Sequence, residues 1–170
     1  MPGEFRIEPL GTAHNRKSFA CGVVALDRYL HEIATQDIRR RVSNCFVACD
    51  ATGAMAAYYT FAATSLPLAD LSPEYAKRLP RYPQVPAGLI GRLAADQRFC
   101  GQRLGGAMIV DAAWRAAAAD LAIYALVVDA KDDQAVAFYR HLGFQLFVSR
   151  PRSLFLPIST ITRALEAAAP

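Results

Sequence analysis

The chain has no uncharged apolar run of about 18 residues, the length that a transmembrane helix requires. Its first residues, Met1–Arg6, include no apolar stretch of the kind found in secretory signals. We therefore expect a protein that stays in the cytosol. Hydrophobic residues make up 54% of the 170 positions and charged residues 20%, which excludes a disordered chain. The length predicts one domain, residues 1–170, with a buried core.

Cysteine and histidine are scarce, at positions Cys21, Cys45, Cys49, Cys100, His14, His31 and His141. Their spacings fit no zinc template, so we expect no metal site. Cys45 and Cys49 lie on a predicted strand and would face the same side as small buried hydrophobic residues. Cys100 has no evident histidine partner, so a nucleophilic role is not expected for it.

Positive charge exceeds negative charge by 4, and the basic residues are clustered. The clusters are Arg39, Arg40 and Arg41; Lys77, Arg78 and Arg81; and Arg140, Arg150 and Arg152. Such clusters favour a phosphate-rich partner, although an ordinary solvated surface explains the charge alone equally well.

Apolar periodicity in the first half predicts a strand at 5–10, a helix at 25–40 and a hairpin of strands 44–50 and 54–64 around Gly53. The proline-rich segment 65–86 is expected to be a functional loop with a short helix that starts at Ser72-Pro73 and ends near Leu79. In the predicted first helix, Leu26, Tyr29, Leu30 and Ile33 share one face.

The second half is predicted to alternate strands and helices. We expect strands at 87–95 and 122–129, helices at 104–118 and 132–142, a pair of final strands at 144–148 and 153–156, and a frayed helix over 161–170. Gly143 is expected to end the predicted helix at 132–142. The inward face of the longer helix should hold Leu104, Met108, Ile109, Ala112 and Ala116, with Trp114 in the core or at an interface.

Several motifs, taken in order, resemble one family. They are Phe19–Val23, Leu26–Leu30, Ala57–Thr60, Lys77–Pro83, Gly91–Ala94, Val128–Asp132 and Phe138-Tyr139. This order resembles the GCN5-related N-acetyltransferases, and within them the toxins that are paired with small DNA-binding antitoxins. The resemblance implies an α/β fold with a mixed, mostly antiparallel sheet that splays between two central strands, and helices on both faces. It also implies acetyl-CoA as cofactor, a homodimer and a ribbon-helix-helix antitoxin as partner.

The cofactor loop of that family reads Gln or Arg, two residues, Gly, one residue, then Gly or Ala. Counted from the end of the strand, Cys100 takes the first position, Arg103 the first glycine and Gly105 the second. The frame that starts at Gln102 fits the formula but misplaces the loop against the strand. Backbone N–H groups and the following helix start hold the pyrophosphate in such loops. If position 103 needs a positive φ, cofactor affinity falls; if not, the Arg103 guanidinium adds a phosphate contact.

The resemblance assigns site residues as follows. The cofactor contacts are Leu93, Ala94, Ala95, Cys100, Gly101, Gln102, Arg103, Leu104, Gly105, Gly106 and Asp132, and the general acid is Tyr139. Plain helix capping explains Asp132 equally well, and a packed core aromatic is the alternative for Tyr139.

The predicted strand 87–95 bears on which amine accepts the acetyl group. The strand 87–95 has no carboxylate to act as a base, and Arg92 is its only charged residue. A lysine amine, with a pKa of about 10.4, would need such a base, whereas a free α-amine titrates at about 7.7–8.0 and an α-amine beside an ester lower still. An aminoacyl-tRNA therefore suits the site, and Arg39, Arg40, Arg41, Lys77, Arg78 and Arg81 are the predicted RNA contacts.

Two other hypotheses stay open at this stage. The same chemistry can act on a small amine or a protein N-terminus, in which case reversing the charge at 39–41 should leave turnover intact. The departures in the cofactor loop can also mark a non-catalytic domain that binds RNA or a partner protein.

Overall fold

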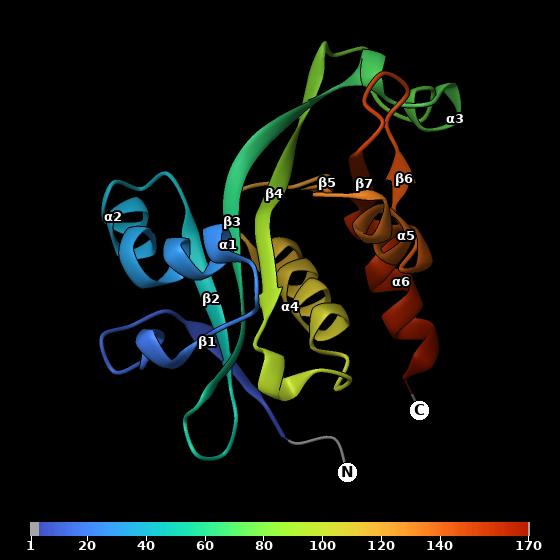
Figure 1. Cartoon of the computed structure of the whole chain (residues 1–170). Helices are drawn as coiled ribbons and strands as arrows, with labels where there is room; N and C mark the ends of the chain where they lie inside the picture. The colour runs from blue at the N-terminus through green and yellow to red at the C-terminus, as the bar shows by residue number, and fades with distance from the viewer. Residues whose placement is uncertain (1–3, 170) are drawn as a thin grey trace. The chain divides into compact units, whose positions relative to one another are not determined.

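The structure is a computed structural model that describes residues 4–169. Within this range seven strands form one sheet in the order β1-β2-β3-β4-β5-β7-β6 (Figure 1). The strands are β1 (Arg6–Pro9), β2 (Asn44–Cys49), β3 (Met55–Pro67), β4 (Gln84–Ala95), β5 (Ala125–Asp129), β6 (Gln145–Leu146) and β7 (Ser153–Pro157). The β4–β5 pair is parallel, whereas β1–β2, β2–β3, β5–β7 and β6–β7 are antiparallel. The predicted mixed, mostly antiparallel sheet is confirmed.

The other regular elements of the described chain are helices. They are η1 (Arg16–Ser18), α1 (Val24–Arg28), η2 (Tyr29–Ile33), α2 (Ala34–Arg39), η3 (Leu68–Asp70), α3 (Pro73–Ala76), η4 (Gln97–Phe99), α4 (Leu104–Ala118), α5 (Asp133–His141) and α6 (Ile158–Ala168). Contacts divide the chain into two compact units, Met1–Ala62 with Gly91–Asp111 and Ala63–Ile90 with Ala112–Pro170.

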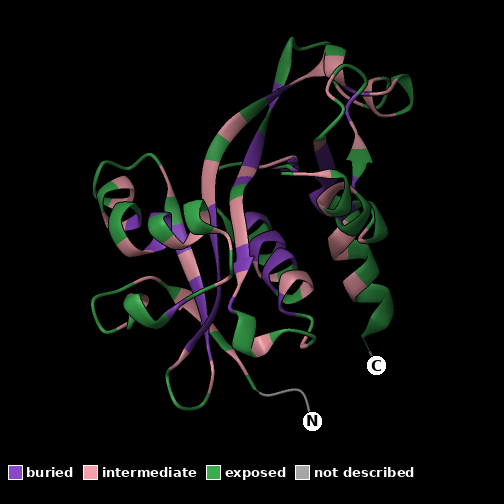
Figure 2. Ribbon diagram, in the orientation of Figure 1, coloured by how far each residue is buried: buried purple, intermediate pink, exposed green. Residues whose placement is uncertain are grey.

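In the first unit, helices cover both faces of the sheet because neighbouring strand residues point to opposite sides. The Tyr58 hydroxyl donates to the Leu26 carbonyl of α1, and the Tyr59 hydroxyl donates to the Asp111 carboxylate of α4 (both 2.6 Å). Figure 2 shows the result, with buried residues on the strands and exposed residues on the outer sides of α1 and α2. Cys45 and Cys49 are both buried in this core, as predicted.

The predicted helix over 25–40 contains a π-helical turn, η2. A π turn adds a residue to the repeat and rotates the following helix face. Tyr29 and Leu30 are buried as predicted, but Ile33 is 37% exposed and Ala34 takes its place in the core. The Arg16 guanidinium donates to the Leu30 carbonyl at 3.4 Å and to the Thr35 hydroxyl at 2.7 Å, and so supports this turn.

In the second unit, a core forms around Phe155 of β7 and reaches the segment 63–86 through Leu66 and Leu71. The Asp70 carboxylate accepts hydrogen bonds from the Ser149 hydroxyl at 2.9 Å and the Arg150 guanidinium at 3.1 Å. The expected irregular segment is shorter than predicted, because β3 runs to Pro67 and β4 begins at Gln84. Propensity alone cannot place these strand ends, which depend on pairing across the sheet.

Helix α4 has the predicted bounds, and its five predicted inward residues are all buried. Trp114 is 54% exposed, so it does not belong to the core, and its predicted place at an interface stays a prediction. The last helix starts at Ile158, three residues before the predicted start, because Pro157 supplies an extended residue at its N-terminus. Within residues 4–169, no helix is long and apolar enough to cross a membrane.

A buried carboxylate at the end of β4 joins three segments of the first unit. Asp96 is 1% exposed. Its carboxylate accepts hydrogen bonds from the Ala20 N–H (2.9 Å), the Arg98 N–H (2.8 Å) and the Arg98 guanidinium (2.9 Å). Its own N–H donates to the Ala56 carbonyl at 2.8 Å. Burial raises the pKa of Asp96, but these hydrogen bonds and the Arg98 charge outweigh burial, so the pKa lies below its ordinary value.

Replacing Asp96→Asn should lower the free energy of unfolding by about 2 kcal/mol at pH 7, because a charged acceptor of several hydrogen bonds becomes neutral. A lowered folded-state pKa stabilises the fold above the unfolded-state pKa of about 3.9, and this contribution is lost as the pH falls through the folded-state value. Urea unfolding should therefore give a difference between wild type and variant that shrinks below about pH 4.

Asp120→Asn, an exposed substitution in the second unit, is the matched control and should change little at any pH. A difference for Asp96→Asn that is absent at pH 7, or that does not change with pH, would contradict this account of the carboxylate.

Candidate active site

The predicted cofactor loop lies between η4 and α4 in the first unit. Gly101 has φ 80° and Arg103 has φ 57°, so the chain twice adopts a left-handed conformation here. A Cβ built on Gly101 or Gly106 would meet no atom within 4 Å, which leaves the loop open for a ligand. The fully buried Asp96 holds the strand end from which this loop departs.

The loop residues fit a pyrophosphate. The first turn of α4 has no acidic side chain, and the helix is 15 residues long, so its unpaired N–H groups present positive potential. Leu104 is buried, whereas Arg103 is exposed. These features suit an anion at a helix N-terminus, and the binding of acetyl-CoA by this loop stays a prediction.

Position 103 adopts a positive φ, so the condition set by the sequence predicts reduced cofactor affinity rather than an added phosphate contact. A left-handed conformation costs a residue with a Cβ about 1 kcal/mol more than it costs glycine. This cost falls on Arg103 and not on Gly101, which also has a positive φ.

The carboxyl end of β4 carries the second part of the predicted cofactor site. Parallel pairing of β4 with β5 covers Ala87–Ile90, and β4 continues to Ala95 beyond these pairs. Leu93 and Ala95 are half-buried and Ala94 is buried. No residue of β4 has a carboxylate, so within the strand only the guanidinium of Arg92 is charged.

Local sequence fixes Tyr139 in the second unit. Gly143, with φ 100°, ends α5, and the N–H groups of Gly143 and Phe144 donate to the carbonyls of Arg140 and Tyr139 (3.0 and 3.1 Å). This is the Schellman pattern, in which the residue after the glycine packs on the last full turn. The Phe144 and Tyr139 rings accordingly meet edge to face at 5.4 Å. The prediction that Gly143 stops this helix is confirmed.

The hydroxyl of Tyr139 has no hydrogen-bond partner among residues 4–169, although the residue is only 7% exposed. The other three buried tyrosines, Tyr29, Tyr58 and Tyr59, each donate to a carboxylate or a carbonyl. The Tyr139 hydroxyl oxygen is not fully enclosed, since Arg150 Nε is the only buried unpartnered side-chain nitrogen or oxygen in the described chain. Burial raises the pKa of Tyr139 to about 12.

Asp132 lies on the same element, at the N-terminus of α5. One of its carboxylate oxygens accepts a hydrogen bond from the Ala135 N–H at 2.8 Å. The Asp132 side chain therefore caps the helix, as one of the two sequence-based interpretations held. The second carboxylate oxygen of Asp132 is the atom left for a ligand.

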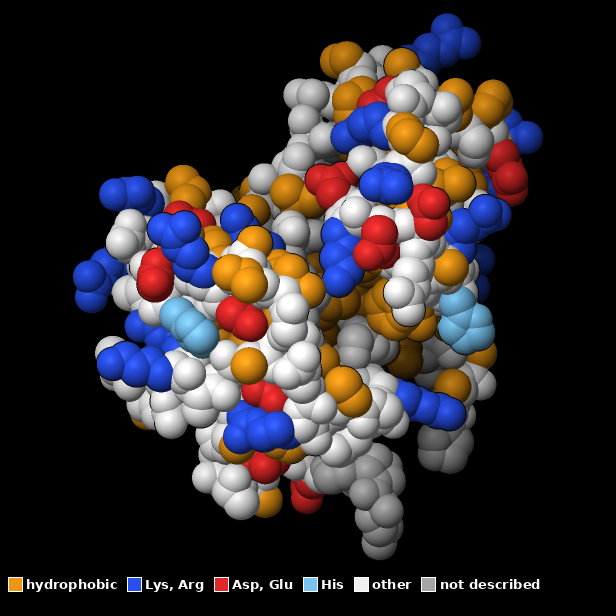
Figure 3. Space-filling model, in the orientation of Figure 1, with side chains coloured by type: hydrophobic (Ala, Val, Ile, Leu, Met, Phe, Trp, Pro, Cys, Tyr) orange, Lys and Arg blue, Asp and Glu red, His pale blue; other side chains and the backbone are white. Residues whose placement is uncertain are grey.

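The predicted RNA-binding residues are all exposed. Arg39, Arg40 and Arg41 follow one another at the end of α2, where Arg41 adopts φ 60° and closes another Schellman pattern through Val42. They form no ion pair within residues 4–169, and Figure 3 shows Lys and Arg side chains gathered over α2. In the second unit, Arg78 pairs with Glu74 at 3.6 Å, while Lys77 and Arg81 extend from the loop after α3.

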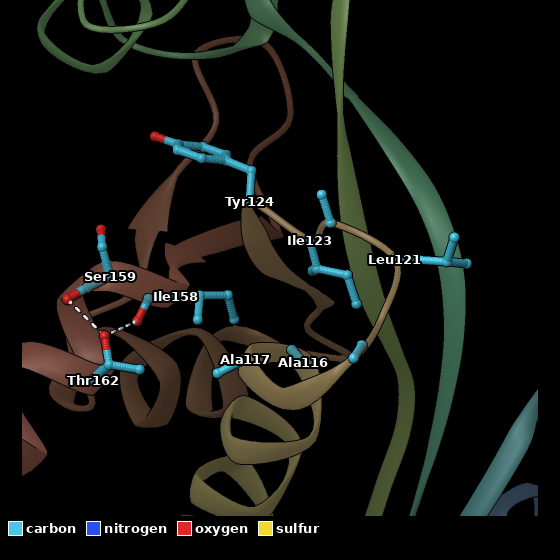
Figure 4. Close-up of a pocket in the computed structure, with 10 residues that line it drawn as sticks. Ala116, Ala117, Leu121, Ile123, Tyr124, Ile158, Ser159 and Thr162 are labelled. Carbon is cyan, nitrogen blue, oxygen red and sulfur yellow. Dashed lines mark hydrogen bonds between the residues drawn. The ribbon is translucent and has the colours of Figure 1, made fainter.

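A cavity of about 470 Å³ in the second unit lies apart from these residues (Figure 4). Its lining comes from the end of α4, the segment before β5 and the start of α6, with Leu121, Ile123 and Ile158 among its apolar walls. None of the predicted catalytic, cofactor or RNA-binding residues lines this cavity, so we assign it no part in the chemistry.

Strand pairing gathers one group of possible metal ligands that sequence spacing could not reveal. Donor atoms of Glu8, His14 and Cys49 lie within 4.8 Å of one another. His14 Nδ1 accepts the Gly11 N–H at 2.9 Å, so Nε2 carries the proton and donates to Glu8 at 2.7 Å. A metal on Nε2 would need the proton on Nδ1, against the Gly11 N–H. The group is therefore assigned to structure rather than to a metal.

Sequence reasoning missed Asp96 as a supporting residue and gave Arg92 no role. Their partners are remote in the sequence: Ala20 stands 76 positions from Asp96. The only available signal was a lone acidic residue directly after the apolar strand.

No protein-family model matches the chain. It is 33% identical over 158 residues to a tRNA-acetylating toxin of Mycobacterium tuberculosis, across 92% of this chain and 93% of that protein. Among solved structures it resembles AtaT complexed with acetyl-methionyl-tRNAfMet, with a TM-score of 0.86, 27% identity and coverage of 95% of this chain and 99% of that one.

The complex AtaTR bound with AcCoA is similar over 97% of this chain and 99% of that one, with a TM-score of 0.80 and 26% identity. The fold agrees with these structures over nearly the whole chain. The chain belongs to the toxin branch of the GCN5-related N-acetyltransferases.

Proposed function

We propose that this chain is an acetyl-CoA-dependent N-acetyltransferase that acetylates the α-amine of aminoacyl-tRNA and thereby blocks translation. The observation that carries the acceptor is the absence of a carboxylate from β4. The family relationship supplies the reaction class, and relatives that acetylate tRNA or bind an acetylated tRNA support the same acceptor.

Residues of the loop, of α4 and of β4 bind and orient the acetyl donor. Acetyl-CoA, when bound, supplies the acetyl group as an activated thioester. The loop 100–106 and the start of α4 hold its pyrophosphate, with the free oxygen of Asp132 as a further contact. Backbone groups of Leu93–Ala95 orient and polarise the thioester carbonyl.

Tyr139 then acts as general acid. As the amine nitrogen bonds to the acetyl carbon and the C–S bond breaks, the Tyr139 hydroxyl donates its proton to the sulfur. The proton that the amine loses goes to water, and water returns a proton to the Tyr139 oxygen. A pKa of about 12 keeps the Tyr139 hydroxyl protonated at every physiological pH.

The α-amine of an aminoacyl ester needs no enzymatic base. Its pKa lies below the value of about 7.7–8.0 found for a free α-amine, so most of it is neutral at cytosolic pH. Arg39, Arg40, Arg41, Lys77, Arg78 and Arg81 contact phosphates of the RNA. We further propose that residues 1–170 form a single acetyltransferase domain in the cytoplasm, that it dimerises, and that a ribbon-helix-helix antitoxin restrains it.

Tyr139→Phe should reduce acetyl transfer to charged tRNA by about 100-fold, because general acid catalysis contributes at least this much. The measurement is transfer of radiolabelled acetyl from acetyl-CoA to bulk charged tRNA, uncharged tRNA and a lysine peptide. Calorimetry with acetyl-CoA is the control and should give nearly equal affinities for wild type and variant.

Label on the lysine peptide would contradict the proposed acceptor. Equal labelling of charged tRNA by wild type and Tyr139→Phe would contradict the role of Tyr139 as general acid. Tight acetyl-CoA binding without any transfer would support a purely binding domain instead.

Arg103→Ala and Arg103→Gly separate the two effects of Arg103. Because the positive φ at position 103 points to reduced cofactor affinity, Arg103→Gly should bind acetyl-CoA more tightly than Arg103→Ala. Arg103→Gly should unfold at higher urea than Arg103→Ala, by about 1 kcal/mol, because only glycine relieves the left-handed strain. Equal acetyl-CoA affinities of the two variants would exclude an effect of the backbone strain at position 103 on cofactor binding.

Charge reversal of Arg39, Arg40 and Arg41 to Glu should raise the KM for charged tRNA more than 10-fold and reduce its dependence on salt, because phosphate contacts are lost. Transfer to a small amine ester should not change. Equal KM values for charged tRNA before and after reversal would place the RNA elsewhere and favour a small-amine acceptor.

A further inference from the structure

Arg92 is held in an unusual way in the first unit. Its guanidinium carbon lies 3.6 Å from the centroid of the Tyr29 ring. Within residues 4–169 it has no carboxylate partner and no hydrogen bond, and the side chain is only half-buried. None of its nitrogens is fully enclosed, because Arg150 Nε is the sole buried unpartnered side-chain nitrogen or oxygen described. The N–H groups at the edge of the guanidinium are thus open to a ligand.

The platform beneath the guanidinium is rigid. The Tyr29 hydroxyl donates to the Asp37 carboxylate at 2.9 Å, and the Tyr29 ring stacks on Tyr58 with 6.4 Å between centroids. Tyr29 opens the π-helical turn η2, and such turns occur often at functional sites. Cation–π contact favours the guanidinium over this ring face and leaves its in-plane donors free.

The groups around Arg92 do not neutralise it. Burial raises the pKa of Tyr29 and of Cys45 to about 12, and it raises the pKa of Tyr58 as well, while the Arg92 charge opposes this rise in all three. All three groups are therefore neutral at pH 7. The carboxylate of Asp37 accepts a hydrogen bond from the Tyr29 hydroxyl.

The position of Arg92 relates this cation to the reaction. It directly precedes Leu93–Ala95 on β4, and strand alternation places it on the same face as Ala94, which packs in one core with Tyr29 and Tyr58. On the proposed function, those three residues orient the thioester, so the acceptor must bring its amine close to this strand end. The phosphodiester nearest to the amine in an aminoacyl-tRNA belongs to the same terminal nucleotide.

We propose that Arg92 binds a phosphodiester oxygen of the acceptor RNA beside the aminoacyl end and so selects a charged RNA over other α-amines. This inference rests on the proposed function. The planar fork of a guanidinium suits two oxygens of one phosphate, a geometry that lysine does not reproduce.

The test compares two acceptors that share the aminoacyl ester. One is an aminoacylated RNA minihelix with a CCA end, and the other is the aminoacyl ester of adenosine, which has no phosphate. Arg92→Gln should raise the KM for the minihelix about 10-fold with little change in kcat, because one charge-assisted contact is lost. It should leave kcat/KM for the adenosine ester unchanged. Arg92→Lys should lie between wild type and Arg92→Gln.

Arg28→Gln is the matched control, since Arg28 is an exposed arginine of the same unit that pairs only with Glu32 within residues 4–169. It should change neither acceptor. Equal losses on both acceptors for Arg92→Gln would overturn the inference and assign Arg92 to packing. No loss on either would overturn it as well.

A binding measurement makes the test independent of turnover. The affinity of uncharged minihelix for Arg92→Gln should fall, and the slope of log K against log salt should decrease by about 0.7, as expected for one single-strand phosphate. An unchanged slope would contradict the phosphate contact. Wild type that binds the minihelix with this Arg92 dependence but acetylates neither ester would overturn the proposed function alone.

Discussion

The first unit depends most on the hydrogen bonds of the fully buried Asp96 carboxylate, at the end of β4 and beside the proposed cofactor loop. Asp96 joins the segment at Ala20 to the end of β4, while its N–H reaches Ala56 of β3. Arg98 supplies the compensating charge from one side. Because the cofactor loop leaves the strand directly after this point, the position of its N–H groups depends on the Asp96 network. Weakening the network would loosen the proposed cofactor site without removing any contacting residue.

The proposed reaction follows from what the site lacks as much as from what it holds. Within residues 4–169 the Tyr139 hydroxyl has no partner and is not fully enclosed, so it is accessible to a ligand, whereas the hydroxyls of Tyr29, Tyr58 and Tyr59 are all hydrogen-bonded. On β4, the strand where a catalytic base would lie, Arg92 is the only charged residue. A protonated acid without a base suits an amine that is already neutral, and a free guanidinium near the acceptor end suits RNA.

Much of the fold was predictable because local patterns determine it. The apolar repeat of α4 gave its bounds and inward face, and Gly143 gave the end of α5. The π turn at Tyr29 was not predictable, since its stability depends on Arg16 and on packing against β2 and β3. The roles of Asp96 and Arg92 depend on contacts with Ala20 and Tyr29, which only the folded chain brings near. The assignments of Tyr139 and of the cofactor loop came from the family resemblance and stay predictions.

The central claim is that the acceptor amine reacts without an enzymatic base. The most direct test is the pH dependence of kcat/KM with two charged tRNAs whose aminoacyl amines differ in pKa. The account predicts that the acidic limb of each profile follows the pKa of the amine and that no alkaline decline occurs before about pH 10, because Tyr139 stays protonated. An acidic limb at one pKa for both acceptors would reveal a titrating base on the enzyme and contradict the account.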